Sequence, residues 1–297
     1  MPTIQPEKAS EIVEIVRANV VARRALAIQG SGSKSNLGRP VDAQEALSLR
    51  GLSGIRSYQP DELILTAWSG TPMPEIQDAL AGRRQHLAFE PACAGNLFGR
   101  GNEAGTIGGV LACNLSGPRR PSAGAARDHF LGFTAVNGRG EEFKAGGKVV
   151  KNVTGYDLPK LLAGSMGTLA VLLEVTVKVL PAPEKQRTII VPVSDIATGH
   201  RSLIAASQEP FEIDGAAFLP AGIAARSGVD LVRASGRAVA ALRLTGSPVS
   251  VADRCAALRA SIGAPSEELH TARSQAFWTQ VGEVAALLPE TSAAALW

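Results

Sequence analysis

The chain has 297 residues, a formal net charge of +3 and a hydrophobic fraction of 45%. This length allows one large or two ordinary domains, and the hydrophobic fraction excludes a disordered chain. The small net charge gives no argument for nucleic acid binding, and three tryptophans and two tyrosines provide no stacking platform for bases. We therefore expect a globular protein that has no nucleic acid partner.

Three cysteines, Cys93, Cys113 and Cys255, lie far apart and form no C-x-x-C pair. This spacing does not suit an iron–sulfur cluster or a structural zinc site within the chain. The odd count, and an acidic N-terminal segment without an apolar signal core, predict free thiols in a reducing compartment. Because no apolar stretch is long enough to span a bilayer, we expect a cytoplasmic protein that reaches a membrane only through a partner.

The first half of the chain alternates between strand and helix patterns. Apolar residues at helical spacing predict one helix capped by Ser10 and another with Met73, Ile76 and Leu80 facing inward. Period-two alternation predicts a strand whose apolar residues share one face: Leu169, Val171, Leu173, Val175, Val177 and Val179. Helices are expected over 10–24 and 72–81, strands over 25–29, 63–68 and 169–179, and a hairpin with an Asn-Gly turn over 133–147.

The segment AIQGSGSKSNLGRP, residues 27–40, has the composition of a phosphate-binding loop. It is not a Walker loop, because Ser33 rather than glycine precedes Lys34. It is not a Rossmann fingerprint either, because the third glycine and the helix that should open from the loop are missing. A glycine–serine turn can still bind an anion through successive backbone N–H groups, and a plain solvent loop is the alternative.

A second glycine-rich run, residues 95–117, holds seven glycines in 23 residues. No regular helix is expected at that glycine density, because each glycine weakens a helix interior. The backbone is expected to pass close to another group, which is either a neighbouring strand or a large flat ligand.

The remainder of the chain, from residue 184, has a different pattern. Strands are expected over 187–193, 213–219, 238–245 and 267–272, and helices over 194–207, 249–262 and 275–288. The first six of these in chain order give β-α-β-β-α-β, which is the ferredoxin-like arrangement. The chain stops at Trp297 directly after a helix, and we expect that a C-terminal segment is missing.

Two later motifs, GTIGGVLACNLSGPRR at 105–120 and KNVTGYDLPKLLAGSMGTLAVLLEVTVKVLP at 151–181, follow the opening loop. Their order and spelling resemble the FAD-binding domain of the vanillyl-alcohol oxidase and p-cresol methylhydroxylase superfamily. Within it, SGPRRPSAGAARDHFLG and KNVTGYDL are most similar to the FAD-binding subunits of bacterial glycolate oxidases. The resemblance implies an α+β fold: a two-part FAD-binding domain of the p-cresol methylhydroxylase type over 1–183, then a ferredoxin-like cap domain over 184–297, incomplete at its C-terminus.

The resemblance also implies which residues bind FAD. The opening loop would wrap the diphosphate, the TIGG segment would lie beside the flavin, and the two later segments would return past the cofactor. The implied cofactor-binding residues are Gly30, Ser31, Gly32, Ser33, Lys34, Thr106, Ile107, Gly108, Gly109, Asn114, Ser116, Gly117, Gly167 and Val171.

Several departures from the family pattern bear on chemistry. The opening loop has no histidine, so the FAD is expected to be noncovalent, and Met166 stands where catalytic relatives carry glutamate. The four histidines are scattered, no metal site is expected, and the catalytic residues stay unassigned. A base and a carboxylate-binding cation are not expected to be grouped in the second domain.

Some polar residues allow two interpretations each. His129 after Asp128 is either a base or a structural residue, and Asp157 after Tyr156 is either part of the site or a helix cap. Six basic residues either neutralise the diphosphate, dock an acidic partner or lie on a solvated face: Arg119, Arg120, Arg127, Lys148, Lys151 and Lys160.

The resemblance implies a function in a complex. This chain would be the FAD-carrying subunit of a glycolate oxidase, which oxidises glycolate, a short 2-hydroxy acid, to glyoxylate by hydride transfer to flavin. A sister flavin subunit and an iron–sulfur subunit would be its partners. The alternatives are a self-sufficient FAD-dependent D-lactate or 2-hydroxyacid dehydrogenase and a non-catalytic assembly subunit.

Overall fold

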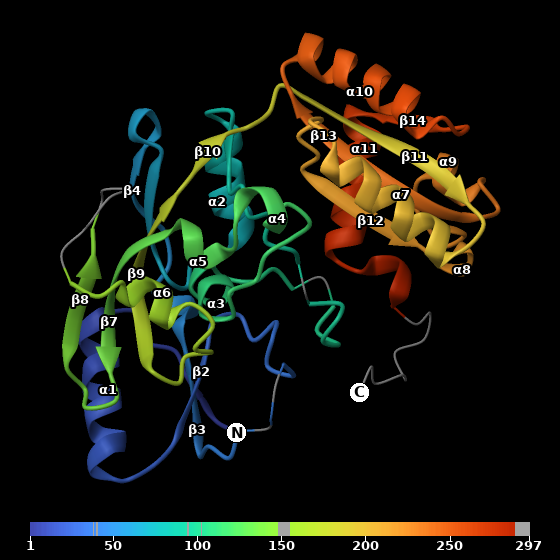
Figure 1. Cartoon of the computed structure of the whole chain (residues 1–297). Coiled ribbons are helices and arrows are strands. Elements are labelled where there is room, and N and C mark those ends of the chain that lie inside the picture. The colour runs from blue at the N-terminus through green and yellow to red at the C-terminus, as the bar shows by residue number, and fades with distance from the viewer. Residues whose placement is uncertain (38, 40, 94, 102, 148–154, 289–297) are drawn as a thin grey trace. The chain divides into compact units, whose positions relative to one another are not determined.

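The computed structural model describes the chain except residues 38, 40, 94, 102, 148–154 and 289–297, and it divides into two compact units. The first unit is Met1–Ser116 with Gly124–Ala182. The second unit is Gly117–Ala123 with the chain from Pro183 onward, drawn from yellow to red in Figure 1. Lys148, Lys151 and the KNVT part of the third motif lie outside the described residues, as does Trp297.

The N-terminal part of the first unit is a helix beside a small parallel sheet. Helix α1 (Ala9–Val21) is followed by β2 (Leu26–Gln29), and the sheet order is β1-β3-β2 with β1 at Thr3–Ile4 and β3 at Glu45–Ser48. Ser10 lies inside α1 rather than capping it, because the Glu11 carboxylate accepts the backbone N–H groups of Glu7 and Lys8. The expected helix and strand are confirmed, and the expected cap is wrong.

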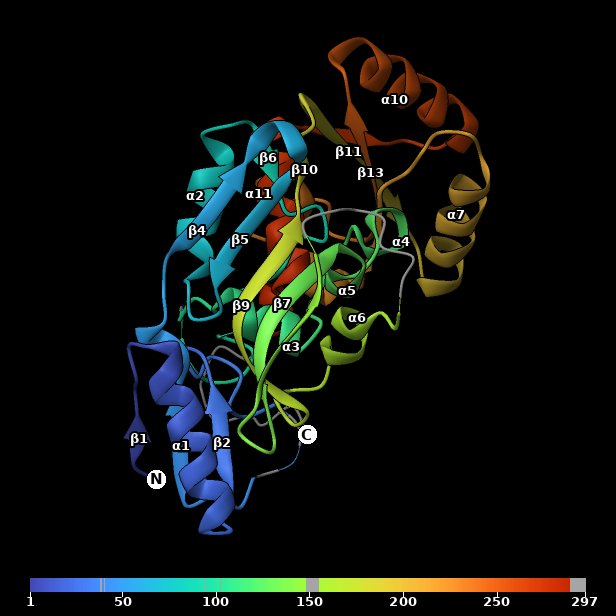
Figure 2. The same cartoon turned by 90° about the vertical axis from the view of Figure 1, so that its left-hand side faces the viewer.

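A five-stranded antiparallel sheet forms the larger part of the first unit, with order β4-β5-β9-β7-β8 (Figure 2). Its strands are β4 (Ile55–Gln59), β5 (Ile64–Trp68), β7 (Phe130–Asn137), β8 (Glu142–Gly146) and β9 (Ala170–Lys178). Strand β9 contributes to two hydrophobic cores. One lies under helices α2 (Met73–Ala81), α3 (Ile107–Ala112), α5 (Ala126–His129) and α6 (Leu158–Leu162), and the other lies under α1. The strand is confirmed and is buried on both faces. Its alternating apolar residues do not share one face, because Val171 and Leu173 belong to the core under α1 and Val175 and Val177 to the other core.

Short elements complete the first unit. Helix α2 (Met73–Ala81) buries Met73, Ile76 and Leu80 as expected. The others are η1 (Leu49–Gly51), η2 (Pro60–Glu62), β6 (Gln85–His86), α3 (Ile107–Ala112), α5 (Ala126–His129), α6 (Leu158–Leu162) and β10 (Leu180–Pro181).

The β7–β8 hairpin is confirmed, although its turn differs from the Asn-Gly turn expected. The Asn137 side chain accepts the backbone N–H groups of Arg139 and Glu141. Gly140, not Gly138, takes the left-handed conformation at φ +76°. The side chain of Asn137 and the freedom of Gly140 therefore form the turn between them.

The expectation that the run at 95–117 contains no helix is wrong, because α3 lies within it. The Thr106 hydroxyl accepts the Gly109 N–H at 3.3 Å and caps the helix. The N–H groups of Ile107 and Gly108 bond to the carbonyls of Thr71 and Ser69 at the end of β5. Tertiary contacts thus offset the low helix propensity of the two glycines.

The second unit is an antiparallel sheet of order β12-β13-β11-β14 with helices on both faces. Its elements are α4 (Arg120–Ala123), β11 (Lys185–Val193), α7 (Ile196–Gln208), β12 (Gly215–Leu219), α8 (Ala221–Ala224), α9 (Asp230–Arg233), β13 (Ala238–Gly246), α10 (Pro248–Ile262), β14 (Glu267–His270), α11 (Thr271–Gly282) and η3 (Ala285–Leu287). The core order of strands and helices is the expected ferredoxin-like one, and α8 and α9 are an unexpected insertion between β12 and β13.

Within the described residues, no helix combines the length and the apolar character that crossing a membrane requires.

Candidate functional site

The opening loop follows β2 and is held in place by side chains outside it. The Ser48 hydroxyl donates to the Gly30 carbonyl at 3.3 Å. The Arg100 guanidinium donates to the Ser35 hydroxyl at 3.0 Å and 2.6 Å, and the Asn36 amide donates to the carbonyl of Phe98 at 2.8 Å. These contacts join the loop to the glycine-rich run and fix its shape.

The loop presents a set of unused hydrogen-bond donors. Among the described residues, no acceptor is present for the backbone N–H groups of Ser31, Gly32, Ser33 and Lys34. The Ser31 hydroxyl is buried and has no partner in the same set of residues. Gly32 has φ +79°, a conformation that lets successive N–H groups converge. Unsatisfied buried donors are costly, so the loop has the hydrogen-bonding capacity for an anion.

Lys34 supplies a positive charge at the same place. Its ammonium donates to the Ser33 hydroxyl at 3.1 Å, and no described Asp or Glu forms an ion pair with it. Burial lowers the pKa of Lys34, while nearby Cys113 and Cys93 oppose that shift. A half-buried ammonium with no carboxylate partner among the described residues, and a row of N–H groups with no acceptor in the same part of the chain, together fit the diphosphate of FAD.

The TIGG segment lies directly against this loop. A Cβ atom added to Gly30 would lie 2.1 Å from the Thr106 hydroxyl oxygen, so the Gly30 backbone lies against the Thr106 side chain. A Cβ on Gly105 would lie 2.8 Å from the Lys34 ammonium nitrogen, and one on Gly109 would lie 3.6 Å from it. The structure therefore brings together the first two predicted motifs.

Gly108 and Ile107 have a packing role instead. A Cβ on Gly108 would lie 2.6 Å from the Ser69 Cβ and 2.8 Å from the Ser69 carbonyl oxygen. The Ile107 side chain is fully buried in the main core of the first unit. Both residues fix α3 on the end of β5, and their contact with FAD stays a prediction.

Asn114 and Ser116 lie past the C-terminal end of α3. Asn114 has φ +51°, and its side-chain oxygen accepts the Arg127 N–H at 3.0 Å. The Ser116 hydroxyl accepts the Ala126 N–H at 2.9 Å. Gly117, next in the chain, belongs to the second unit. Both side chains therefore shape the loop before α5.

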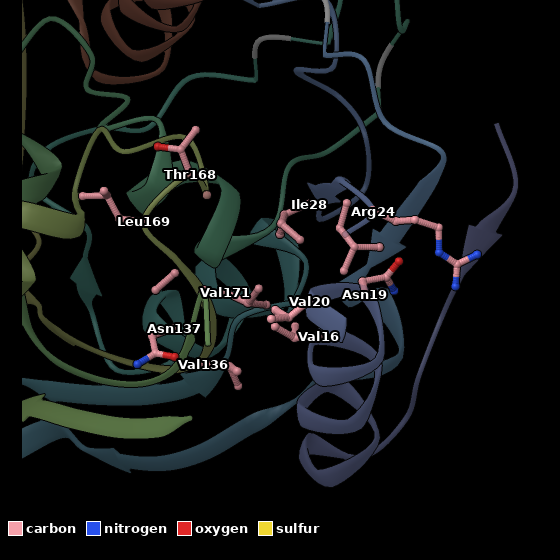
Figure 3. A pocket seen from close by; sticks show the side chains of 14 residues that line it. Val16, Asn19, Val20, Arg24, Ile28, Val136, Asn137, Thr168, Leu169 and Val171 are labelled. Atoms are coloured by element: carbon pink, nitrogen blue, oxygen red, sulfur yellow. The ribbon is translucent and has the colours of Figure 1, made fainter. Parts of the chain in front are cut away.

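Gly167 and Val171 lie at the start of β9. Gly167 has φ +76°, and a Cβ there would lie 3.2 Å from the Cβ of Ile28 in β2. The Val171 side chain is buried in the core under α1 and also lies in the wall of a cavity beside that helix (Figure 3). Met166 is half exposed, and its N–H bonds to the carbonyl of Ala112.

Other candidate residues of the first unit have structural surroundings. Asp157 caps α6, accepts the Lys160 N–H at 3.3 Å and pairs with the Lys160 ammonium at 2.7 Å. These contacts, the side-chain hydrogen bond first, lower the pKa of Asp157. Tyr156 is 94% exposed, and His129 is buried with its ring 5.3 Å from that of Phe89. Arg120 and Arg127 are exposed.

The second unit contains a buried cluster of two arginines and one aspartate. Arg243 is fully buried, and its Nε donates to the Asp214 carboxylate at 2.8 Å. Arg119, from the segment that joins this unit, pairs with the other Asp214 oxygen at 3.6 Å. The Thr245 hydroxyl donates to that second oxygen as well. The cluster thus holds two guanidinium groups for one carboxylate.

A chain of hydrogen bonds supports this cluster. Arg119 donates to Gln186 at 3.5 Å, Gln186 donates to Ser274 at 3.0 Å, and Ser274 meets Thr188 at 2.7 Å. Trp278 donates to the Thr188 hydroxyl at 2.7 Å, and its ring lies 4.6 Å from the Arg243 guanidinium carbon. Such a network fixes the positions of both guanidinium groups.

The grouping of Arg119, Asp214 and Arg243 was not expected, but it places no available base beside a cation. The sequence did not reveal the group because Arg119, Asp214 and Arg243 belong to three distant segments. Arg119, weighed as a diphosphate or surface residue, belongs to this cluster instead. Asp214 is engaged through both carboxylate oxygens, which makes it a ligand of the arginines rather than an available base. No three His, Cys, Asp or Glu of the described chain gather as a metal site.

Comparison with known proteins places this site in context. The chain is 45% identical over 172 residues to "Glycolate oxidase subunit GlcE" of Escherichia coli (strain K12), covering 58% of this chain and 47% of that protein. It is 28% identical over 194 residues to a D-lactate dehydrogenase of Anaerostipes hadrus, covering 64% of this chain and 38% of that protein. The chain thus spans less than half the length of these relatives.

Solved structures share the fold. An alkyldihydroxyacetonephosphate synthase has a TM-score of 0.74 at 16% identity, covering 96% of this chain and 54% of that one. A p-cresol methylhydroxylase with substrate bound has a TM-score of 0.69 at 13% identity, covering 96% and 60%. Residues 2–146 match the family described as FAD binding domain. Residues 2–146 are thus similar to an FAD binding domain, the chain shares the fold of p-cresol methylhydroxylase, and FAD is its cofactor.

Proposed function

We propose that this chain is the FAD-carrying subunit of a glycolate oxidase complex, which oxidises glycolate to glyoxylate. The observation that carries the proposal is the loop of free donors around Lys34, which lies against the TIGG segment. The identity of 45% to a glycolate oxidase subunit supports the choice of this complex.

The residues of the first unit have distinct parts in holding FAD. The N–H groups of Ser31–Lys34 and the Lys34 ammonium would bind the diphosphate, and Gly105 and Gly109 leave room for it beside α3. Thr106, capping α3, keeps the segment in place. Bound FAD supplies the hydride acceptor. Because the loop has no histidine, the FAD is held without a covalent bond.

Glycolate oxidation also needs a cation for the substrate carboxylate and a base for its hydroxyl proton. Arg119 and Arg243 are buried and paired with Asp214, so the cation for the substrate carboxylate is not assigned in this chain. A base is not assigned in this chain, because both Asp214 oxygens are occupied and His129 is buried against Phe89. We propose that a sister flavin subunit carries out the oxidation and that an iron–sulfur subunit accepts the electrons, with any membrane attachment made through these partners.

The experiment is anaerobic mixing of the purified, FAD-loaded chain with excess glycolate, followed by the visible absorbance of the flavin. General-base catalysis is worth ~10²–10⁴-fold, so the chain alone should bleach slowly. Adding the sister subunits should restore fast bleaching. D-lactate serves as the second substrate, because a D-lactate dehydrogenase is among the relatives.

Two results would contradict the proposal. Fast bleaching by the isolated chain would instead make it a self-sufficient 2-hydroxyacid dehydrogenase. A chain that binds no FAD even on reconstitution would be a non-catalytic assembly subunit.

A further inference from the structure

Residues 95–101 of the glycine-rich run form a closed turn, which we call the strap. The backbone N–H groups of Phe98 and Arg100 both donate to the Gly95 carbonyl, at 3.2 Å and 2.7 Å. A Cβ atom added to Gly95 would lie 2.4 Å from the carbonyl oxygen of Gly101, so the two ends of the strap lie against each other. This close approach needs a glycine at position 95, because any side chain there would meet backbone.

The base of the strap is fixed by the residues that flank it. The Cys93 thiol donates to the Glu103 carbonyl oxygen at 3.7 Å, and the same oxygen lies 2.9 Å from the position of a Cβ on Gly95. The Glu103 carboxylate pairs with the Arg50 guanidinium at 3.5 Å, and both side chains are exposed. Exposed ion pairs contribute little to stability, so the backbone packing at Gly95 is the main support of the base.

Two side-chain contacts join the strap to the opening loop, one from each side. The Arg100 guanidinium donates through Nε and Nη2 to the Ser35 hydroxyl oxygen, at 3.0 Å and 2.6 Å. In the opposite direction, the Asn36 amide donates to the Phe98 carbonyl at 2.8 Å. Ser35 and Asn36 directly follow Lys34, so both contacts act on the end of the loop that carries the ammonium group.

The Arg100 contact is suited to set the shape of the loop before a ligand binds. A hydrogen bond from a charged donor is stronger than one between neutral groups, and the planar guanidinium offers its N–H groups in a fixed geometry. The Ser35 N–H bonds to the Gly32 carbonyl at 3.1 Å, so a shift of Ser35 would move the turn that presents the N–H groups of residues 31–34. A binding loop that is ordered in advance loses less conformational entropy when its ligand binds.

We propose that Arg100 is a positioning residue for the cofactor. It holds the diphosphate loop in its binding conformation through Ser35, and the Asn36 contact supports the loop from the other side. Arg100 is not among the residues that the resemblance implies for FAD, because it belongs to the strap and acts on the ligand through the loop. This inference rests on the proposed function, because it takes residues 30–34 as the diphosphate site.

The test measures the affinity of the full chain for FAD by flavin fluorescence, after its own flavin has been removed. The variants are Arg100→Met, Ser35→Ala and the two combined. Each single variant removes the same contact and should weaken FAD binding about tenfold, the effect of one ordinary hydrogen bond. The double variant should bind FAD no more weakly than either single variant, because the contact can be lost only once. Arg100→Lys keeps a charged donor and should recover most of the lost affinity.

Two controls separate positioning from stability and from net charge. The melting temperature of the flavin-free chain should be the same with and without Arg100→Met, since Arg100 and Ser35 are both exposed. Arg237→Met removes an exposed arginine of the second unit and should leave the FAD affinity unchanged.

Four results would overturn the role of Arg100. They are an Arg100→Met variant that binds FAD as tightly as the unaltered chain, an Arg100→Lys variant as weak as Arg100→Met, single effects that multiply in the double variant, and an equal loss of affinity in Arg237→Met. A flavin-free melting temperature that falls together with the affinity makes Arg100 a stability residue and overturns the inference as well. An unaltered chain that binds no FAD overturns the proposed function itself.

Discussion

Gly108 and Gly109 are neighbours in sequence but meet different groups, and this predicts opposite effects of substitution. A Cβ on Gly108 would overlap Ser69 at 2.6 Å, whereas one on Gly109 would have 3.3 Å to the Thr106 hydroxyl and would face Lys34. Gly108→Ala should destabilise the fold by about 1–3 kcal/mol through overpacking. Gly109→Val should lower the FAD content instead, because its methyl groups would enter the space around Lys34.

The measurements are the melting temperature and the FAD bound per chain for each purified variant. Gly222→Ala is the control, since a Cβ at Gly222 meets nothing within 4 Å. Gly109→Val with unchanged FAD content would show that this segment does not lie against the cofactor.

The residue scale also shows what sequence can reveal of the site. Gly30–Lys34 and Thr106–Gly109 were recognisable because each motif is contiguous and consists of residue types with distinctive backbone behaviour. The Arg119–Asp214–Arg243 cluster was not, because its members are ordinary charged residues that β12, β13 and the segment 117–123 bring together.

At the scale of elements, α7 has an N-cap that predicts a pH effect. Hydrogen bonds from the Ser194 hydroxyl and then the Thr198 N–H lower the pKa of Asp195 from an ordinary 3.8 to about 2. A depressed carboxyl pKa contributes stability above the unfolded value, and that contribution is lost as the pH falls through the folded value. The cap should therefore stabilise α7 fully above about pH 4 and lose its effect toward about pH 2.

The test compares the urea unfolding midpoints of the unaltered chain and of the Asp195→Ala variant at several pH values. The variant should be the less stable at neutral pH, and the gap should close as the pH falls from about 4 to about 2. A gap that stays constant over this range would mean that the charge of Asp195 does not contribute to the cap.

Helix α3 shows why element prediction failed in one place and succeeded in others. For α2 and β5, the apolar residues of the sequence pattern are the ones that are buried, so the local pattern was sufficient to predict both elements. For α3, the local composition opposes a helix, and its stability comes from bonds to Thr71 and Ser69 and from the buried side chains of Ile107, Val110 and Leu111. Such partners cannot be inferred from the segment itself.

At the scale of the whole molecule, the mode of FAD attachment is open to a direct test. The opening loop offers N–H groups, hydroxyls and an ammonium but no histidine for a covalent bond. We expect the purified chain to be yellow and to release intact FAD when denatured by acid or heat. Flavin that stays with the precipitated protein would contradict noncovalent binding.

The strand order of the second unit was predictable from six elements in sequence, since β-α-β-β-α-β segments commonly adopt the ferredoxin-like order. The helices α8 and α9 were not, because four-residue helices carry too few residues for a periodic signal.

The path of the chain between the two units limits which segments can be exchanged with those of a related protein. The chain passes from one unit to the other after Ser116, returns after Ala123 and passes again after Ala182. A chain cut after Ala182 would keep Gly117–Ala123 but leave Arg119 without Asp214. The second unit is therefore not a removable tail: a chimera with a related protein must transfer both segments together, or the graft will separate Arg119 from its aspartate.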